Sequence, residues 1–184
     1  MCDAVLVRTF AALLRGINVG GRTLVPMADL RALLVSIGLE DVTTYIQSGN
    51  VVFRTAETGT KSLTAAIERA VAERFGVDVS VLLRTPAQLS GLPGRNPFLP
   101  GGRQGALHVV FLDRKPKADA VAGLDPDRSP GDRWSVDGRE IFLQLPSGSG
   151  RSKLTLDWFE RRLGVRGTVR NWRTVLELIS RTGG

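Results

Sequence analysis

Three segments of this 184-residue sequence combine positive charge with glycine or with a helix start, a combination that suits anion binding. The first is RGINVGG at positions 15–21, whose ligand-binding candidates are Arg15, Gly16, Asn18, Gly20 and Gly21. The glycines allow backbone N–H groups to face a ligand, and Arg15 and Asn18 can bind a phosphate or a carboxylate. The segment lacks the lysine of a Walker A loop and the spacing of a dinucleotide-binding loop. In the alternative, the glycines serve a tight connection and Asn18 bonds its own backbone.

The second segment, SGSGRSK at positions 147–153, links an expected strand to an expected helix over 152–163. Arg151, Ser152 and Lys153 would then lie at the helix N-terminus. A cation is unfavourable there by about 0.3–1 kcal/mol, because the helix dipole is positive at that end. A bound anion would relieve the repulsion. In the alternative, the long side chains reach away from the helix end and pair with Asp157, Glu160 or Glu177.

The third segment repeats this arrangement at the last expected helix. Asn171 is expected to cap that helix, and Arg170 and Arg173 flank the cap. If the three segments converge in space, they form a basic cleft between the two halves of the chain that binds a phosphate-bearing ligand. The expected partner is a nucleotide or a nucleic acid.

A predicted hairpin over 45–53 supplies two further candidates, Ser48 and Asn50. An RNA-recognition motif would place aromatic residues on the strand after its glycine. Aligning that glycine on Gly49 puts Asn50 and Val52 where the first two aromatics belong, which argues against base stacking of this type. The alternative role of Ser48 and Asn50 is turn geometry.

Reactive and metal-binding side chains are scarce in the sequence. The single cysteine, Cys2, excludes an internal disulfide, and one histidine, His108, leaves too few soft ligands for a zinc site. A Ser-His-Asp system would need His108, which lies in an apolar strand and fits a core position better than a general base. No metal and no cofactor are expected, and whether the protein is an enzyme stays open. The three tryptophans, Trp134, Trp158 and Trp172, fit core positions. For Trp172, the alternative is stacking on a nucleic-acid base.

The positive charge is concentrated in the second half of the sequence. Residues 93–184 carry sixteen basic and ten acidic side chains, against nine and eight in residues 1–92, within a net charge of +7. This distribution indicates an anionic partner. The alternative is compositional, because 21 of the 25 basic residues are arginine and the chain is rich in Ala, Gly and Val, as in a GC-rich genome.

Composition and hydropathy describe a globular chain. With 42% hydrophobic and 23% charged residues, disorder and coiled coil are excluded for the chain as a whole. No stretch of about 18 apolar residues is present, and the start lacks the charged leader and cleavage site of a signal peptide. We therefore expect a cytoplasmic protein without a membrane partner, and its oligomeric state stays open.

Hydrophobic periodicity predicts two similar halves. The first half is expected to contain strands at 5–14, 42–47, 50–55 and 77–83 and helices at 26–37 and 62–75, with Ser48-Gly49 as a two-residue turn. After a short helix at Thr85-Pro86 and a connector rich in Gly and Pro, the pattern repeats. Strands are expected at 106–112, 134–136, 140–145 and 165–169, and helices at 116–122, 152–163 and after Asn171.

This order predicts an α+β fold of two tandem ferredoxin-like (βαββαβ) units with a C-terminal helix. The expected boundaries are 1–84 for the first unit, 85–104 for the connector and 105–184 for the second unit with its C-terminal helix. The two units are expected to share one compact body.

Five motifs occur together in the sequence: LLRGINVGG (13–21), TYIQSGNVVF (44–53), NPF (96–98), SKL (152–154) and TVRNW (168–172). Together they resemble the bacterial domain-of-unknown-function family 1697, over about residues 8–181. The resemblance implies a stand-alone cytoplasmic protein with a ferredoxin-like α/β fold, and it implies no established activity.

Three functions therefore stay open. The leading expectation is a binding module for a phosphate-bearing ligand. The second is an enzyme that acts on a small anionic substrate through arginine and lysine electrostatics. The third is an interaction scaffold in which the motifs only shape the fold.

Overall fold

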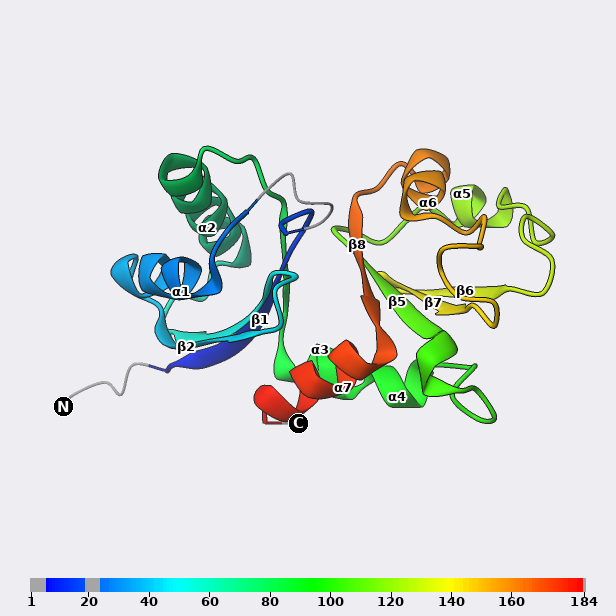
Figure 1. Ribbon diagram of the computed structural model, residues 1–184, viewed down its shortest axis with the longest axis horizontal. Helices are drawn as coiled ribbons and strands as arrows, with labels where there is room; N and C mark the ends of the chain where they lie inside the picture. The colour runs from blue at the N-terminus through cyan, green and yellow to red at the C-terminus, as the bar shows by residue number, and fades with distance from the viewer. Residues whose placement is uncertain (1–5, 19–23, 184) are drawn as a thin grey trace. The chain divides into compact units, whose positions relative to one another are not determined.

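The structure is a computed structural model that describes residues 6–18 and 24–183 (Figure 1). The chain divides into two compact units, the first comprising Met1–Ser90 with Glu177–Gly184 and the second comprising Gly91–Leu176. The boundaries at 84 and 104 that the sequence suggested stay a prediction.

The first unit contains one four-stranded antiparallel sheet with the strand order β2-β3-β1-β4. Its elements are β1 (Arg8–Leu14), α1 (Met27–Ser36), β2 (Glu40–Tyr45), β3 (Asn50–Thr55), α2 (Thr60–Phe75), β4 (Val81–Arg84) and the short helix α3 (Pro86–Ser90).

The second unit contains a second antiparallel sheet, with the strand order β6-β7-β5-β8. Its elements are α4 (Leu92–Arg95), the 3-10 turn η1 (Gln104–Ala106), β5 (Leu107–Leu112), α5 (Ala118–Ala122), β6 (Arg133–Asp137), β7 (Glu140–Gln144), α6 (Leu156–Leu163) and β8 (Gly167–Asn171). The predicted α+β class is confirmed.

The last helix, α7 (Trp172–Arg181), is divided between the units. Its residues up to Leu176 belong to the second unit, and those from Glu177 onward belong to the first. Within the first unit, the Arg181 guanidinium lies 5.2 Å from the centroid of the Tyr45 ring. None of the helices in the described ranges has the length and apolarity that a membrane span requires.

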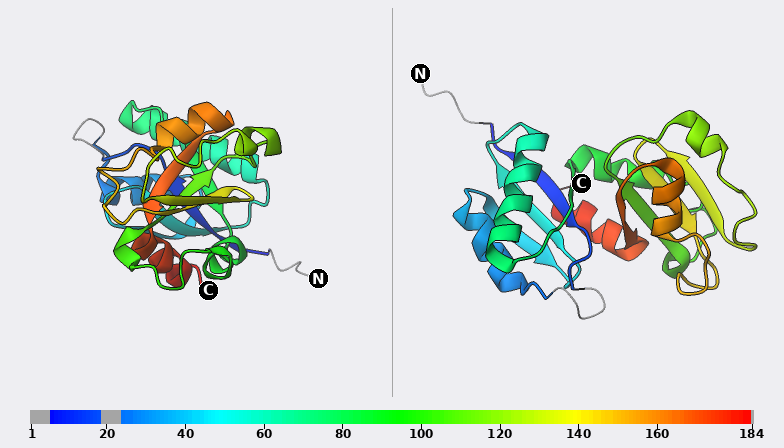
Figure 2. Two further views of the ribbon diagram at one scale, coloured as in Figure 1. Left: turned by 90° about the vertical axis from the view of Figure 1, so that its right-hand side faces the viewer. Right: turned by 90° about the horizontal axis from the view of Figure 1, so that it is seen from above.

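In each unit, one face of the sheet packs against two helices, and a cluster of buried apolar side chains lies between them. In the first unit, α1 and α2 lie on the same side of the sheet (Figure 1). Phe10, Ala12 and Leu14 alternate along β1 and pack with buried apolar side chains of these two helices. In the second unit, α5 and α6 lie side by side on one face of the sheet (Figure 2), and Phe159 and Leu163 of α6 are buried. Each fully buried side chain of this size contributes about 1.5–3 kcal/mol.

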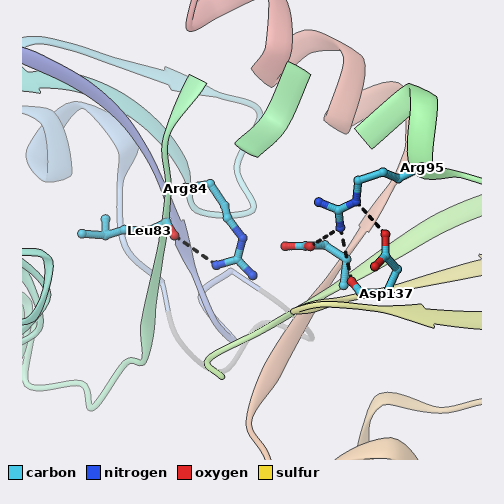
Figure 3. A network of polar contacts seen from close by, with 5 residues as sticks. Leu83, Arg84, Arg95 and Asp137 are labelled. Atoms are coloured by element: carbon cyan, nitrogen blue, oxygen red, sulfur yellow. Dashed lines mark hydrogen bonds and ion pairs between the residues drawn. The ribbon is translucent and has the colours of Figure 1, made fainter. Parts of the chain in front are cut away.

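In each sheet, the face turned away from this helix pair also buries an arginine, and the two arginines stand at corresponding positions. In the sheet registers, Arg84 and Arg170 occupy the same place on the fourth strand relative to the first strand. They are only 1% and 8% exposed. In both, Nη1 donates to the carbonyl oxygen of the preceding residue, at 3.0 Å for Arg84 (Figure 3) and 2.8 Å for Arg170. The two sheets thus repeat one local arrangement.

The hairpin between β2 and β3 differs from the prediction. Strand β2 ends at Tyr45, so the connection is the four-residue loop 46–49 and the expected two-residue turn is wrong. Ile46 and Gly49 have positive φ values of 49° and 72°, which end the extended backbone. The Asn50 side chain closes the loop because its Nδ2 donates to the Tyr45 carbonyl oxygen at 3.2 Å.

Candidate functional site

The side chain of Asn18 fastens the first candidate loop to its neighbours in the first unit. Its Nδ2 donates to the carbonyl oxygens of Val25 at 2.9 Å and Gln47 at 2.7 Å, and its Oδ1 accepts from the Val25 N–H at 2.8 Å. Asn18 has a φ of 55°, a conformation that asparagine tolerates better than most residues. Both amide hydrogens are therefore used by the backbone, as the structural alternative expects.

The structure describes two of the remaining candidates of this loop, Arg15 and Gly16. Arg15 is half-buried, and its backbone N–H donates to the Ser80 carbonyl oxygen at 2.9 Å. Gly16 is exposed, with a φ of 74°. Gly20 and Gly21 lie outside the described residues. Arg15 therefore stays a candidate for binding an anion.

Ser48 and Asn50 have the geometry of the structural alternative. Asn50 is fully buried, and its Nδ2 donates to Ser48 Oγ at 3.0 Å. Between them, a Cβ added at Gly49 would lie 2.8 Å from Leu14 Cβ and 2.9 Å from the Ile17 side chain. The tight hairpin requires these residues, which accounts for the motif without a ligand.

The helix after the second segment begins later than expected. Helix α6 starts at Leu156 instead of position 152, because Thr155 caps it by accepting the Trp158 N–H at 3.2 Å. Ser152 Oγ accepts the Leu154 N–H at 3.0 Å in the stretch before the helix. Arg151 and Lys153 therefore precede the helix, and the argument from its dipole is wrong for them. The first turn of α6 contains an acidic residue, which the dipole favours.

The loop nevertheless exposes its cations. Ser129 holds the loop, since its Oγ accepts the Lys153 N–H at 3.1 Å and donates to Asp132 at 2.6 Å. Arg151 and Lys153 are exposed, and within the described ranges neither forms an ion pair. The pairing that the alternative expected is not seen: Asp157 pairs with Arg161, Glu177 with Arg181, and a Glu160 oxygen accepts the Gly167 N–H.

A cavity of about 360 Å³ lies beside this loop within the second unit, lined by Arg103, Gly105, Ala106, Leu145, Pro146 and Gly148. The Leu145 N–H donates to the Ala106 carbonyl oxygen at 2.7 Å, which joins its two walls. The Arg151 N–H donates to the Gly148 carbonyl oxygen at 3.2 Å, so Arg151 stands one turn from the cavity. The basic strip, as we call it, consists of Arg103, Arg151, Lys153 and the exposed Arg128 beside Ser129.

Sequence reasoning missed Arg103 and Arg128. Arg103 directly follows Gly101-Gly102, a pairing of glycine and cation like those singled out elsewhere in the sequence. Gly148 lies more than forty positions later in the chain, so no local sequence pattern indicates that the two residues line one cavity. Arg128 stands in a Pro-rich loop and has no sequence signal at all.

The third segment is mostly structural. The predicted cap is confirmed, because Asn171 Oδ1 accepts the Thr174 N–H at 2.8 Å. Arg170 points inward and donates to Thr168 Oγ1 at 2.7 Å. Burial lowers the pKa of Arg170 to about 10, so it stays charged at neutral pH. Arg173 is the exposed member of this group.

Arg95 forms a separate polar cluster in the second unit (Figure 3). Its Nε lies 2.8 Å from Asp137 Oδ2 and its Nη2 lies 2.5 Å from Glu140 Oε2. Burial by itself would lower the Arg95 pKa, but hydrogen bonds and attraction from Glu140 and Asp137 raise it. Because these charges compensate one another, the cluster stabilises the fold and does not compete for an anion.

His108 is half-buried, and its Nδ1 is enclosed without a hydrogen-bond partner among the described residues. Burial lowers its pKa below the ordinary value of 6.5, although the nearby backbone of Ala106 acts in the opposite direction. Trp172 is 1% exposed, so stacking of a base on its ring is wrong for this structure. The described part of the chain contains no group of three or more His, Cys, Asp or Glu side chains placed to hold a metal ion.

Comparison with known proteins gives a fold and a family. No match to a curated protein sequence was found. The solved structure of a conserved bacterial protein from Streptococcus pneumoniae is similar over 96% of this chain and 99% of that chain, with a TM-score of 0.75 at 24% identity. This similarity shows a shared fold. The model of the family "Protein of unknown function (DUF1697)" matches residues 7–142, in agreement with the resemblance of the motifs, and the chain therefore belongs to this family.

Proposed function

We propose that the second unit binds a phosphate-bearing ligand through the basic strip. The observation that carries this proposal is the cavity of about 360 Å³, whose lining includes the exposed Arg103 and Gly148 of the glycine-rich loop. A guanidinium can bind two phosphate oxygens at once, and Gly148, with a φ of 84°, allows a backbone turn that most residues disfavour.

The charge of the second unit supports the same ligand class. Residues 91–176 carry fifteen basic and nine acidic side chains. Several of the acidic side chains are already paired with Arg95, Arg114 and Arg161. The members of the basic strip have no such carboxylate partner in the described ranges, and their unpaired charge favours an anion.

We also infer that both units are ferredoxin-like, so that the chain is a tandem of two βαββαβ units. The support is the strand order, which places the first strand between the third and the fourth in each sheet. A wider cleft that would join Arg15 to the basic strip, and a cytoplasmic location, stay predictions. The enzyme and scaffold alternatives stay predictions as well.

Calorimetric titration of the full chain with tripolyphosphate tests the proposal. Replacing Arg103 and Arg151 together by Ala should abolish most of the binding. The matched control replaces Arg114 and Arg161 by Ala, which removes the same charge from cations that are already paired. Equal losses in both double variants would show that only net charge matters, and no binding by the unaltered protein at low salt would refute the proposal.

A further inference from the structure

We infer that the ligand of the basic strip is a single-stranded nucleic acid and that Trp158 is the surface on which one of its bases stacks. This inference rests on the proposed function, because it names the ligand class of the same site. It adds an aromatic group to a site so far built from cations and a glycine-rich loop.

Trp158 is held in a fixed position with one side occupied by a cation. Its ring meets the buried Phe159 ring edge-on, with centroids 4.8 Å apart and an interplanar angle of 65°. Its backbone N–H is bound by the cap Thr155. The Arg128 guanidinium lies 5.8 Å from the ring centroid, and the side chain of Trp158 is only half-buried. A planar group thus already covers the ring at the protein surface.

The hydrogen bonds of the loop place Trp158 at the end of the basic strip. The Lys153 N–H donates to Ser129 Oγ, which brings Lys153 next to Arg128, the residue over the ring. In the other direction, the Arg151 N–H donates to Gly148 at the cavity. Cations therefore follow one another from the cavity to the aromatic ring.

This sequence of groups fits a chain of nucleotides better than a lone phosphate. Proteins that bind single strands combine a positive groove that follows the backbone with aromatic rings on which bases stack. Stacking accepts every base, because every base has a π-face. Duplex DNA hides these faces, so the arrangement favours unpaired bases.

Arg128 has a defined part in this binding. In the free protein it covers the indole ring, where a cation is attracted by the π-electrons. A base takes its place on the ring, and the released guanidinium then binds an adjacent phosphate. The ring is thereby covered in both states, and the cation contributes to binding only when the base is present.

The test compares two probes that carry the same charge. Fluorescence anisotropy is measured with a labelled single-stranded oligonucleotide and with an abasic deoxyribose-phosphate oligomer of equal length, at one fixed salt concentration. Trp158→Leu should weaken binding of the oligonucleotide about fivefold or more and leave binding of the abasic oligomer unchanged. Trp158→Phe should restore part of the loss.

Trp134→Leu is the matched control, since Trp134 also packs against Phe159, with centroids 6.3 Å apart, and none of the described arginines lies over its ring. It should leave both affinities unchanged, and circular dichroism checks that each variant is folded. If both probes bind equally and Trp158→Leu changes neither, the stacking inference is wrong and the proposed function stands. If a duplex binds as tightly as the single strand, the ligand class is wrong. If neither probe binds, the inference and the proposed function both fail.

Discussion

Replacing Gly49 by alanine tests whether the hairpin motif is a requirement of the fold. Gly49 has a φ of 72°, and an added Cβ would lie 2.8 Å from Leu14 Cβ and 2.9 Å from two carbons of Ile17. Both neighbours are fully buried, so neither can move into solvent. The substitution therefore combines a backbone cost with a steric one.

Gly76 supplies a control in which only the backbone cost is present. It ends α2 with a φ of 66°, and nothing lies within 4 Å of an added Cβ. A left-handed conformation costs an L-residue about 1–2 kcal/mol, and alanine recovers about 0.4–1 kcal/mol by restricting the unfolded chain. Gly76→Ala should therefore destabilise the first unit by about 1 kcal/mol.

Gly49→Ala carries in addition the overpacking of a filled core, which costs about 1–3 kcal/mol. We expect a total of about 2–4 kcal/mol. The three tryptophans lie in the second unit, so their fluorescence does not follow this change. Native-state hydrogen exchange on peptides from β1 and β3 reports it directly. Equal destabilisation by Gly49→Ala and Gly76→Ala would refute the steric reasoning.

Three further predictions concern polar groups. Arg95→Ala should lower the free energy of unfolding by about 1–3 kcal/mol, because it removes a partner of the buried Glu140. Arg54→Ala breaks an exposed ion pair and should lower it by less than about 1 kcal/mol. Equal losses for the two variants in urea titrations would contradict the role given to burial. Proton NMR should show the His108 imidazole titrating below pH 6.5. Because its pKa is lowered in the folded state, its contribution to stability is present above pH 6.5 and is lost as the pH falls through the folded pKa. A midpoint at or above 6.5 would show that burial does not dominate the pKa. Asn18→Ala should destabilise the first unit by about 2–4 kcal/mol through three lost hydrogen bonds and leave tripolyphosphate affinity unchanged, and a loss of affinity would instead make Asn18 a ligand.

Local signals were sufficient where a residue acts on its sequence neighbours. Strand β3 has the predicted ends at positions 50 and 55, and Asn171 caps α7 as expected. The start of α6 was not predictable in this way, because Ser152 and Thr155 are both suitable caps. The structure uses Thr155 as the cap. Ser129, which stands 24 residues earlier in the chain, binds the Lys153 N–H just before it.

The candidate site shows the same limit. Arg170 and Arg173 look alike as cations beside a cap, yet Arg170 is buried within β8 and Arg173 is exposed in the first turn of α7. Burial of a single strand position depends on what covers the sheet, which a charge pattern does not reveal. Arg103 was missed for the complementary reason, since only the folded chain brings it to Gly148.

The division of α7 between the units has a consequence for synthesis of the protein. Residues 91–176 leave the ribosome before residues 177–184, although the latter complete the first unit. The second unit is one continuous stretch of chain, whereas the first unit needs residues that are synthesised last. Until those residues emerge, Tyr45 has no Arg181 to cover its ring. The first unit, although translated first, is the last to be completed.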